Sequence, residues 1–246
     1  MNLIVLMAGS TEAFKSDGYF YPKNLIEING IPMVEHVINN LAPVIKHCNS
    51  VTFVVSKNED VKFHTGKIIR LMVPSANVIP VEEQTAGAAC SALMGIDHIE
   101  EDAPLLIMNG DQILDIDFHK MLEKFSNREW DGGMVVFKAL HPRWSYVRCN
   151  DEGWVEEAAE KEPISDQATA GVCYYSEGID FIESAMSSIE KNASVEDAYF
   201  IVPSYNEMLL KHKRIGTFKI EAKNYHSLMT PQLLRRYESQ LLMEEV

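Results

Sequence analysis

Apolar positions in the first half of the chain alternate between two patterns. Short apolar runs at 3–7, 51–55 and 77–81 are typical of strands covered on both faces. Between them, apolar residues recur at helical spacing over 33–41 and 61–72. This β-α-β-α order predicts a mostly parallel sheet flanked by helices.

The remainder of the chain continues the sheet and then changes character. Apolar runs and turn residues predict further strands at 104–109, 132–138, 144–149, 154–158, 170–175 and 215–220. Helical spacing and capping residues predict helices over 85–99, 118–125, 178–189, 194–210 and 230–243. Because the middle strands follow one another closely, we expect an antiparallel meander in the second half.

Composition narrows the class of protein. The chain has 246 residues, 46% of them hydrophobic, which is enough to build one α/β domain with a large core. A net charge of -14 argues against nucleic acid or an anionic membrane as the main partner. No apolar run is long enough to span a bilayer and no charged-then-apolar leader is seen, so we expect a cytoplasmic protein. Four scattered cysteines predict free thiols, mostly in the core.

The first strand leads into a turn of small residues. Ala8, Gly9, Ser10 and Thr11 leave backbone N–H groups accessible, which suits a phosphate group. A tight βα connection is the other interpretation of this turn. Further along, Pro22 precedes Lys23 and stiffens the backbone beside the lysine, so the 3–32 segment predicts a lysine held near a phosphate-binding turn.

This segment resembles the N-terminal motif of the nucleotidyltransferase family, whose members join a nucleoside triphosphate to a phosphorylated metabolite, usually a sugar phosphate, and release pyrophosphate. In that motif the first glycine is followed by any residue, a second glycine, a threonine or serine, and an arginine that grips the triphosphate. Gly9 matches, but Thr11, Glu12 and Ala13 stand at the last three positions. The resemblance implies a catalytic role for Lys23 on the transferring phosphates, and we expect Lys15 to replace part of the missing arginine.

Two later segments continue the resemblance in the nucleotide half. Residues 82–90 are similar to the family segment around the nucleobase and ribose, which implies that Gln84 and Gly87 bind the nucleotide; the other interpretation is a helix start capped by Thr85. The strand at 104–109 ends on Asn109, which we place with the nucleotide, and Gly110-Asp111 follows.

The matching Gly-Asp pair of the family supplies a magnesium ligand. The resemblance therefore implies Mg²⁺ as cofactor and Asp111 as its ligand and as a catalytic residue; an ordinary turn aspartate is the alternative. Better-known members carry a second metal-binding aspartate just before a Thr-Pro pair, where this chain has Ser227.

Asp115 and Asp117 support a rival interpretation. Closely spaced acids hold the metal in many glycosyltransferases of similar architecture, with the fold known as GT-A. The same residues also suit the start of the helix at 118–125, because acidic side chains cap helix N-termini.

The second half resembles the acceptor-binding part of the family. Glu160-Lys161 and the strand around Gly171 are similar to the family's Glu-Lys motif and its following Gly-x-Tyr strand. The resemblance implies that Glu160 binds an acceptor hydroxyl or amine and that Gly171 lies in the acceptor site. It also implies that Lys161 binds the acceptor phosphate and is a catalytic residue, because it neutralises charge in the transfer step. A solvated charge run is the other interpretation of 156–162. The stretch HPRWSYV at 141–147 is similar to a branch found with capsule and surface-glycan genes.

The sequence thus predicts a single-domain α/β nucleotidyltransferase with a Rossmann-like, mixed but mostly parallel sheet flanked by helices. Residues 1–115 form the nucleotide-binding half and 116–246 the acceptor-binding half. We expect a nucleoside triphosphate, CTP or UTP rather than dTTP, and a phosphorylated small-molecule acceptor such as a sugar phosphate or phosphoglutamine. The partners include neither nucleic acid nor a membrane. A non-catalytic nucleotide-binding protein, suggested by Ala13 and Ser227, and the glycosyltransferase stay as alternatives.

Overall fold

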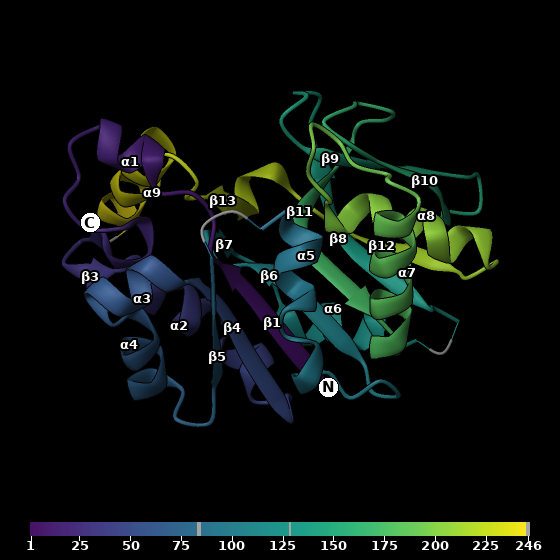
Figure 1. Ribbon diagram of the computed structural model, residues 1–246. Helices are drawn as coiled ribbons and strands as arrows, with labels where there is room; N and C mark the ends of the chain where they lie inside the picture. Colours follow the sequence, from purple (N-terminus) through teal and green to yellow (C-terminus); the bar gives the residue numbers. More distant parts are fainter. Residues whose placement is uncertain (83–84, 128, 245–246) are drawn as a thin grey trace.

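A computed structural model describes residues 1–82, 85–127 and 129–244. Its main sheet has nine strands, and seven of them follow the order β10-β9-β11-β6-β1-β4-β5. The half that the early part of the chain builds is parallel throughout (Figure 1). Its strands are β1 (Asn2–Met7), β4 (Ser50–Ser56), β5 (Asn77–Val81) and β6 (Leu105–Asn109).

The later strands make the sheet mixed. β11 (Gln167–Tyr175) runs antiparallel to both β6 and β8 (Gly132–Lys138), while β12 (Ile215–Ile220) runs parallel to β8. β9 (Ser145–Cys149) and β10 (Val155–Glu160) form an antiparallel pair that extends the sheet beyond β11. The predicted fold class, a mixed sheet with a parallel half in one α/β domain, is therefore confirmed.

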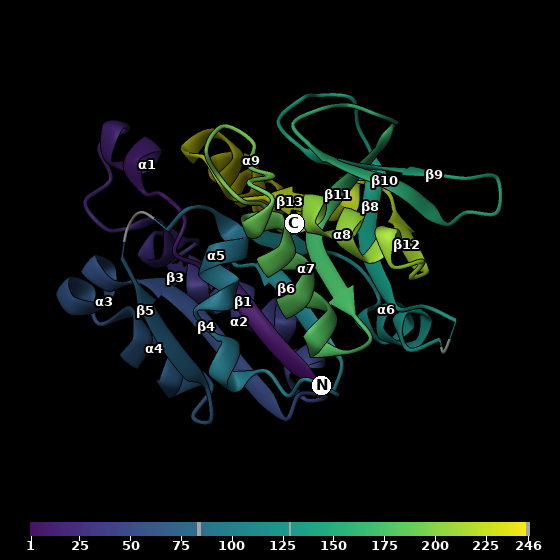
Figure 2. The same cartoon turned by 45° about the vertical axis from the view of Figure 1, so that its right-hand side comes forward.

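Helices cover both faces of this sheet (Figures 1 and 2). Leu3 and Val5 of β1 point into one core cluster, whereas Ile4 points into the other, as expected of a strand buried on both sides. The first cluster includes side chains of α2 (Met33–Ile45), α4 (Thr65–Met72), α6 (Phe118–Phe125) and α9 (Pro231–Glu244). The second includes α5 (Ala88–Leu93), α7 (Gly178–Glu190) and α8 (Ile201–Leu210).

Short elements lie at the carboxyl edge of the parallel strands, and the sequence pattern did not predict them. They are α1 (Glu12–Ser16), the hairpin of β2 (Glu27–Ile28) with β3 (Ile31–Pro32), and the antiparallel pair of β7 (Gln112–Leu114) with β13 (Tyr225–Ser227). Three 3-10 turns cover Lys23–Leu25, Ile96–His98 and Ala222–Asn224.

Three helix predictions were wrong in extent. The helix expected over 61–72 is two helices, α3 (Lys57–Phe63) and α4, because His64 adopts a left-handed conformation with φ 60°. The helix expected from 194 begins only at Ile201, and its predicted start is a turn in which Glu196 and Asp197 are left-handed. The helix expected to reach 99 ends at Leu93 and is followed by a 3-10 turn.

The cysteines are free thiols, as predicted. Only Cys173 is buried; Cys48, Cys90 and Cys149 are half-buried, so the expectation of mostly core positions was wrong. Burial raises the pKa of the Cys173 thiol to about 12, which keeps it protonated and unreactive. Across the described part of the chain, no helix combines the length and apolar character that crossing a membrane requires.

Candidate active site

A buried lysine and an aspartate meet at the carboxyl edge of the sheet. β1 and β6 are parallel neighbours, so the turns that follow them lie side by side, and the N–H of Gly110 donates to the carbonyl of Leu6 at 2.8 Å. Lys23 Nζ lies 2.8 Å from Asp111 Oδ2, and the two side chains are 4% and 17% exposed. The structure therefore brings together the two residues that the sequence analysis named as catalytic in the nucleotide half.

A buried carboxylate on α3 holds the segment that carries Lys23. Glu59 accepts hydrogen bonds from Thr11 Oγ1 at 2.7 Å and from Asn24 Nδ2 at 3.0 Å. Thr11 Oγ1 in turn accepts from the backbone N–H of Lys23 at 3.2 Å. Burial raises the pKa of Glu59 despite these hydrogen bonds, which favour the charged form. Glu59 thus ties the turn, the lysine segment and α3 into one unit.

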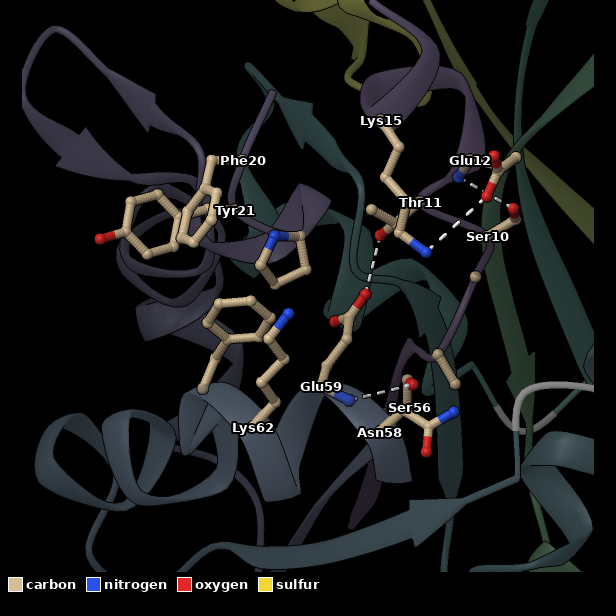
Figure 3. A pocket seen from close by; sticks show the side chains of 14 residues that line it. Ser10, Thr11, Glu12, Lys15, Phe20, Tyr21, Ser56, Asn58, Glu59 and Lys62 are labelled. Carbon is tan, nitrogen blue, oxygen red and sulfur yellow. Dashed lines mark hydrogen bonds and ion pairs between the residues drawn. The ribbon is translucent and has the colours of Figure 1, made fainter. Parts of the chain in front are cut away.

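A cavity of about 390 Å³ opens between the 8–22 segment and α3, and we call it the loop cavity (Figure 3). Five residues predicted to bind nucleotide line it, namely Ala8, Gly9, Ser10, Thr11 and Lys15. Its other walls were not predicted and include Phe20, Tyr21, Ser56, Asn58, Glu59, Lys62 and Phe63. Lys15 extends from α1 past Thr11 and is 60% exposed, with its Nζ 3.7 Å from Glu12 Oε2 (Figure 3).

A second cavity of about 200 Å³ lies along β6 and β11, and we call it the strand cavity. Asn109, Glu160 and Gly171 line it, so Asn109 lies with the two residues predicted to bind the acceptor. Its remaining walls are mostly aromatic and aliphatic, with Arg143, Trp144, Ser145, Phe200 and Tyr225 among them.

Glu160 is the acid of the strand cavity. Its carboxylate accepts a hydrogen bond from the Ser145 hydroxyl, and burial raises its pKa. Gly171 is required beside it, because its φ is +60° and a Cβ there would lie 2.3 Å from Asn109 Nδ2. A side chain at this position would push the Asn109 amide out of place.

Lys161 and Gly87 border the site through one connecting segment. Lys161 forms an ion pair with Glu196, and its Nζ lies 5.7 Å from the Phe200 ring centroid. Gly87 has φ +112°, and a Cβ there would lie 2.3 Å from the Tyr199 carbonyl oxygen. The segment before α8 therefore contacts both predicted motifs. Gln84, the remaining predicted nucleotide-binding residue, lies outside the described residues.

The acids of the rival interpretation are both engaged elsewhere. Asp117 caps α6, accepting from the N–H groups of His119 and Lys120 at 3.0 and 3.1 Å. Asp115 Oδ2 lies 2.6 Å from His226 Nε2. The helix-capping interpretation of Asp117 is confirmed, and these contacts do not present the two acids as a metal-binding pair.

The protein groups near Asp111 show which ligands a bound metal ion could take from the chain. No group of three or more His, Cys, Asp or Glu residues able to hold a metal occurs within residues 1–82, 85–127 and 129–244. Asp111 is next to Leu228, whose N–H donates to its backbone carbonyl, and Ser227 supplies only a hydroxyl there. Mg²⁺ commonly uses one or two carboxylates and takes its other ligands from phosphate and water. Asp111 therefore fits an ion that arrives with a triphosphate.

Several lining residues escaped the sequence analysis for different reasons. Lys62 and Glu59 lie on a helix whose predicted start was four residues too late. Arg143 and Trp144 were noted only as part of the HPRWSYV stretch, and Tyr225 belongs to a three-residue strand without a clear apolar pattern. A basic residue beside a tryptophan, just before a meander strand, is the signal that could have identified Arg143.

The chain is similar to known proteins in sequence and in fold. The family model described as nucleotidyl transferase matches residues 4–218. Bifunctional protein GlmU of Thermotoga sp. strain RQ2 is 24% identical over 212 residues, covering 84% of this chain and 44% of the relative. GlmU of Methanocaldococcus jannaschii is 24% identical over 225 residues, covering 89% and 49%. The chain thus spans less than half the length of these relatives.

A solved structure shows the same fold. The nucleoside-diphosphate-sugar pyrophosphorylase from Vibrio cholerae RC9 is 22% identical and superposes with a TM-score of 0.84. The match covers 97% of this chain and 100% of that one. The arrangement of sheet and helices is therefore shared along the whole chain.

Proposed function

Because the chain belongs to the nucleotidyl transferase family, we propose that it transfers a nucleoside monophosphate from a nucleoside triphosphate to a phosphorylated small metabolite and releases pyrophosphate. The observation that carries this proposal is the place of the Lys23–Asp111 pair. Gly9 lines the loop cavity, and a Cβ on Gly9 would lie 3.0 Å from Lys23 Nζ. Asn109 lines the strand cavity and precedes Asp111 by two residues. A two-substrate reaction needs this kind of junction.

The proposed step is an in-line displacement. An oxygen of the acceptor phosphate attacks the α-phosphorus of the triphosphate, the bond from that phosphorus to the β-bridging oxygen breaks, and pyrophosphate leaves with the electron pair. No general base is needed, because the attacking phosphate is already an anion. Lys23 donates hydrogen bonds to the transferring phosphate oxygens and stabilises the charge that develops there. Glu59 keeps Lys23 in place through Thr11.

Magnesium is the proposed cofactor, with Asp111 as its protein ligand. When bound, Mg²⁺ neutralises phosphate charge and orients the triphosphate. Asp111 already accepts a hydrogen bond from Lys23 through Oδ2, so the carboxylate would serve both cations. Ser227 stands where better-known members have a second acid, so we expect the remaining ligands to come from the nucleotide and from water.

The nucleotide and the acceptor are assigned by side-chain chemistry. We propose CTP or UTP as donor, because Gln84 can both donate to and accept from a pyrimidine edge. The acceptor is a sugar phosphate or another phosphorylated metabolite such as phosphoglutamine, in a pathway for capsule or surface-glycan precursors. The nucleotide-sugar chemistry in the name of the Vibrio cholerae structure supports the sugar-phosphate option.

The strand cavity suits such an acceptor. Glu160 offers a buried carboxylate to a hydroxyl or amine, and Arg143 is the one base among the described residues that line the cavity. Arg143 stacks on Trp144, with 5.0 Å from its guanidinium carbon to the ring centroid. Lys161 lies at the edge and pairs with Glu196. We propose that Lys161 binds the acceptor phosphate, with Arg143 contributing a second positive charge.

A matrix of triphosphates against phosphorylated acceptors, read by pyrophosphate release, tests the proposed function. We expect release only when both substrates and Mg²⁺ are present, and strongest with CTP or UTP. A protein that binds triphosphate and releases no pyrophosphate with any acceptor in the matrix would be a non-catalytic binder. Transfer from a nucleotide sugar instead would support the glycosyltransferase alternative.

A further inference from the structure

The loop cavity lacks the cation that the family motif provides. A bound triphosphate brings about four negative charges, and phosphate sites commonly answer them with Arg or Lys side chains. Ala13 occupies the position of the family's arginine and can offer no charge. Among the described residues, Lys15 and Lys62 line the loop cavity and Lys23 Nζ lies beside Gly9, so these three lysines are the candidates for binding the triphosphate if the proposed function holds.

Two of the three lysines already have a carboxylate partner. Lys23 is bound to Asp111 at 2.8 Å. Lys15 Nζ lies 3.7 Å from Glu12 Oε2 on the same short helix, and Figure 3 shows its side chain running from α1 past Thr11 with the Nζ paired to Glu12. Each of these lysines brings an acid with it, so neither adds net positive charge to the loop cavity.

Lys62 differs from both. It extends from α3 into the loop cavity, on the side of Glu59 where Phe20 and Tyr21 lie (Figure 3). Its Nζ lies 4.9 Å from the Phe63 ring centroid and 5.9 Å from that of Phe20, and no carboxylate of the described residues lies within ion-pair distance of it. The Lys62 ammonium group therefore lies beside two aromatic rings and, among the described residues, forms no ion pair.

We propose that Lys62 is a triphosphate-binding residue of this protein, supplying from α3 the positive charge that the turn after β1 lacks. The inference rests on the proposed function, since it names a residue of the same nucleotide site. Aromatic neighbours suit this role, because they orient the ammonium without neutralising it as a carboxylate does. Phe63 and Phe20 are then positioning residues.

The matched experiment compares three lysines. Lys62→Gln and Lys15→Gln each remove one charge at the loop cavity. Lys67→Gln removes one charge from an exposed position on α4 that does not line this cavity. Equilibrium binding of CTP and UTP with Mg²⁺ is measured for each protein by calorimetry, with steady-state constants for triphosphate and acceptor. Because a charge-assisted hydrogen bond is lost, we expect Lys62→Gln to weaken triphosphate binding about tenfold or more and to leave the acceptor constant unchanged.

Three further variants distinguish the loss of the Lys62 charge from a folding defect. Lys62→Arg keeps the charge and should bind triphosphate within about threefold of the parent, which a purely structural defect in Lys62→Gln does not predict. Ala13→Arg in the Lys62→Gln protein should recover much of the lost affinity, because it restores a cation to the motif position. Phe63→Leu keeps apolar bulk and should weaken binding less than Lys62→Gln does.

The outcomes distinguish this inference from the proposed function. If Lys62→Gln binds triphosphate like the parent and Lys15→Gln does not, Lys15 is the replacement cation and the inference is wrong while the enzyme assignment stands. Equal weakening by Lys62→Gln and Lys67→Gln means that only net charge matters, and also overturns it. A parent protein that binds no triphosphate contradicts the proposed function and the inference with it.

Discussion

Asp111→Asn should destabilise the protein as well as remove a metal ligand. The substitution keeps the size of the side chain but deletes the charge that faces Lys23. Lys23 is 4% exposed, and its Nζ makes its one hydrogen bond to a side chain of the described residues with Asp111. The variant therefore leaves a buried ammonium group facing a neutral amide.

The size of the effect follows from burial. Removing one partner of a fully buried ion pair costs about 3–5 kcal/mol, because the remaining charge is desolvated without compensation. Asp111 is 17% exposed at a cavity, so water can reach the pair, and we expect about 2–4 kcal/mol. For a domain of this size, that corresponds to a melting temperature roughly 4–16 °C lower.

Chemical denaturation at pH 7 measures the effect, with a double-mutant cycle as control. Lys23→Met removes the ammonium and leaves an acid that is easier to solvate, so it should cost less than Asp111→Asn. In the double variant Lys23→Met/Asp111→Asn neither charge remains, and we expect a coupling of about 1–3 kcal/mol in the free energy of unfolding.

The refuting result is specific. If Asp111→Asn unfolds at the same denaturant concentration as the parent and the cycle shows no coupling, Lys23 is not held by Asp111 in solution. The geometry at the junction of the two cavities would then be wrong, and the proposed role of Lys23 would lose its basis.

Two acids give the remaining predictions. Burial raises the pKa of Glu160, so as the pH is lowered this carboxylate should become protonated, and acceptor binding should weaken, at a higher pH than for an exposed glutamate. Glu160→Gln should raise the acceptor constant about tenfold and leave the triphosphate constant unchanged. The variant should also lose the decrease of kcat/KM at low pH that the parent shows. The raised pKa of Glu59 means that its contribution to stability is complete below its ordinary value of 4.5 and is lost as pH rises through the folded value. The stability of the parent relative to Glu59→Gln, followed by denaturation from pH 4 to 7, should therefore decrease; an increase contradicts the burial of Glu59.

The regular parts of the fold could be predicted because their pattern is local. β1 and β4 are apolar runs buried on both faces, β5 is a partly buried edge strand, and the 118–125 prediction coincides with α6. The break at His64 could not be seen, because apolar spacing continues across it and the left-handed residue is neither glycine nor asparagine. Similarly, the turn at Glu196 and Asp197 looks like a favourable acidic helix start.

The site divides in the same way. Gly9, Lys23 and Asp111 follow strands or a proline in recognisable motifs, so their residue types and neighbours indicate the chemistry. Glu59 and Lys62 act from a helix 48 or more residues away from the turn they support, and only tertiary packing brings them there. The net charge of the loop cavity could not be predicted either, because it depends on which carboxylate each lysine pairs with in the folded protein.

The most direct test of the central claim follows the α-phosphorus through one turnover. The protein is mixed with Mg²⁺, the acceptor found in the matrix, and CTP or UTP labelled at the α-phosphate, with Lys23→Ala as control. The account predicts that the α label appears in the acceptor product in equal amount to the pyrophosphate released, and that Lys23→Ala slows this by about two to three orders of magnitude. Label that remains on the free nucleotide while orthophosphate accumulates, or transfer that does not depend on Lys23, would contradict it.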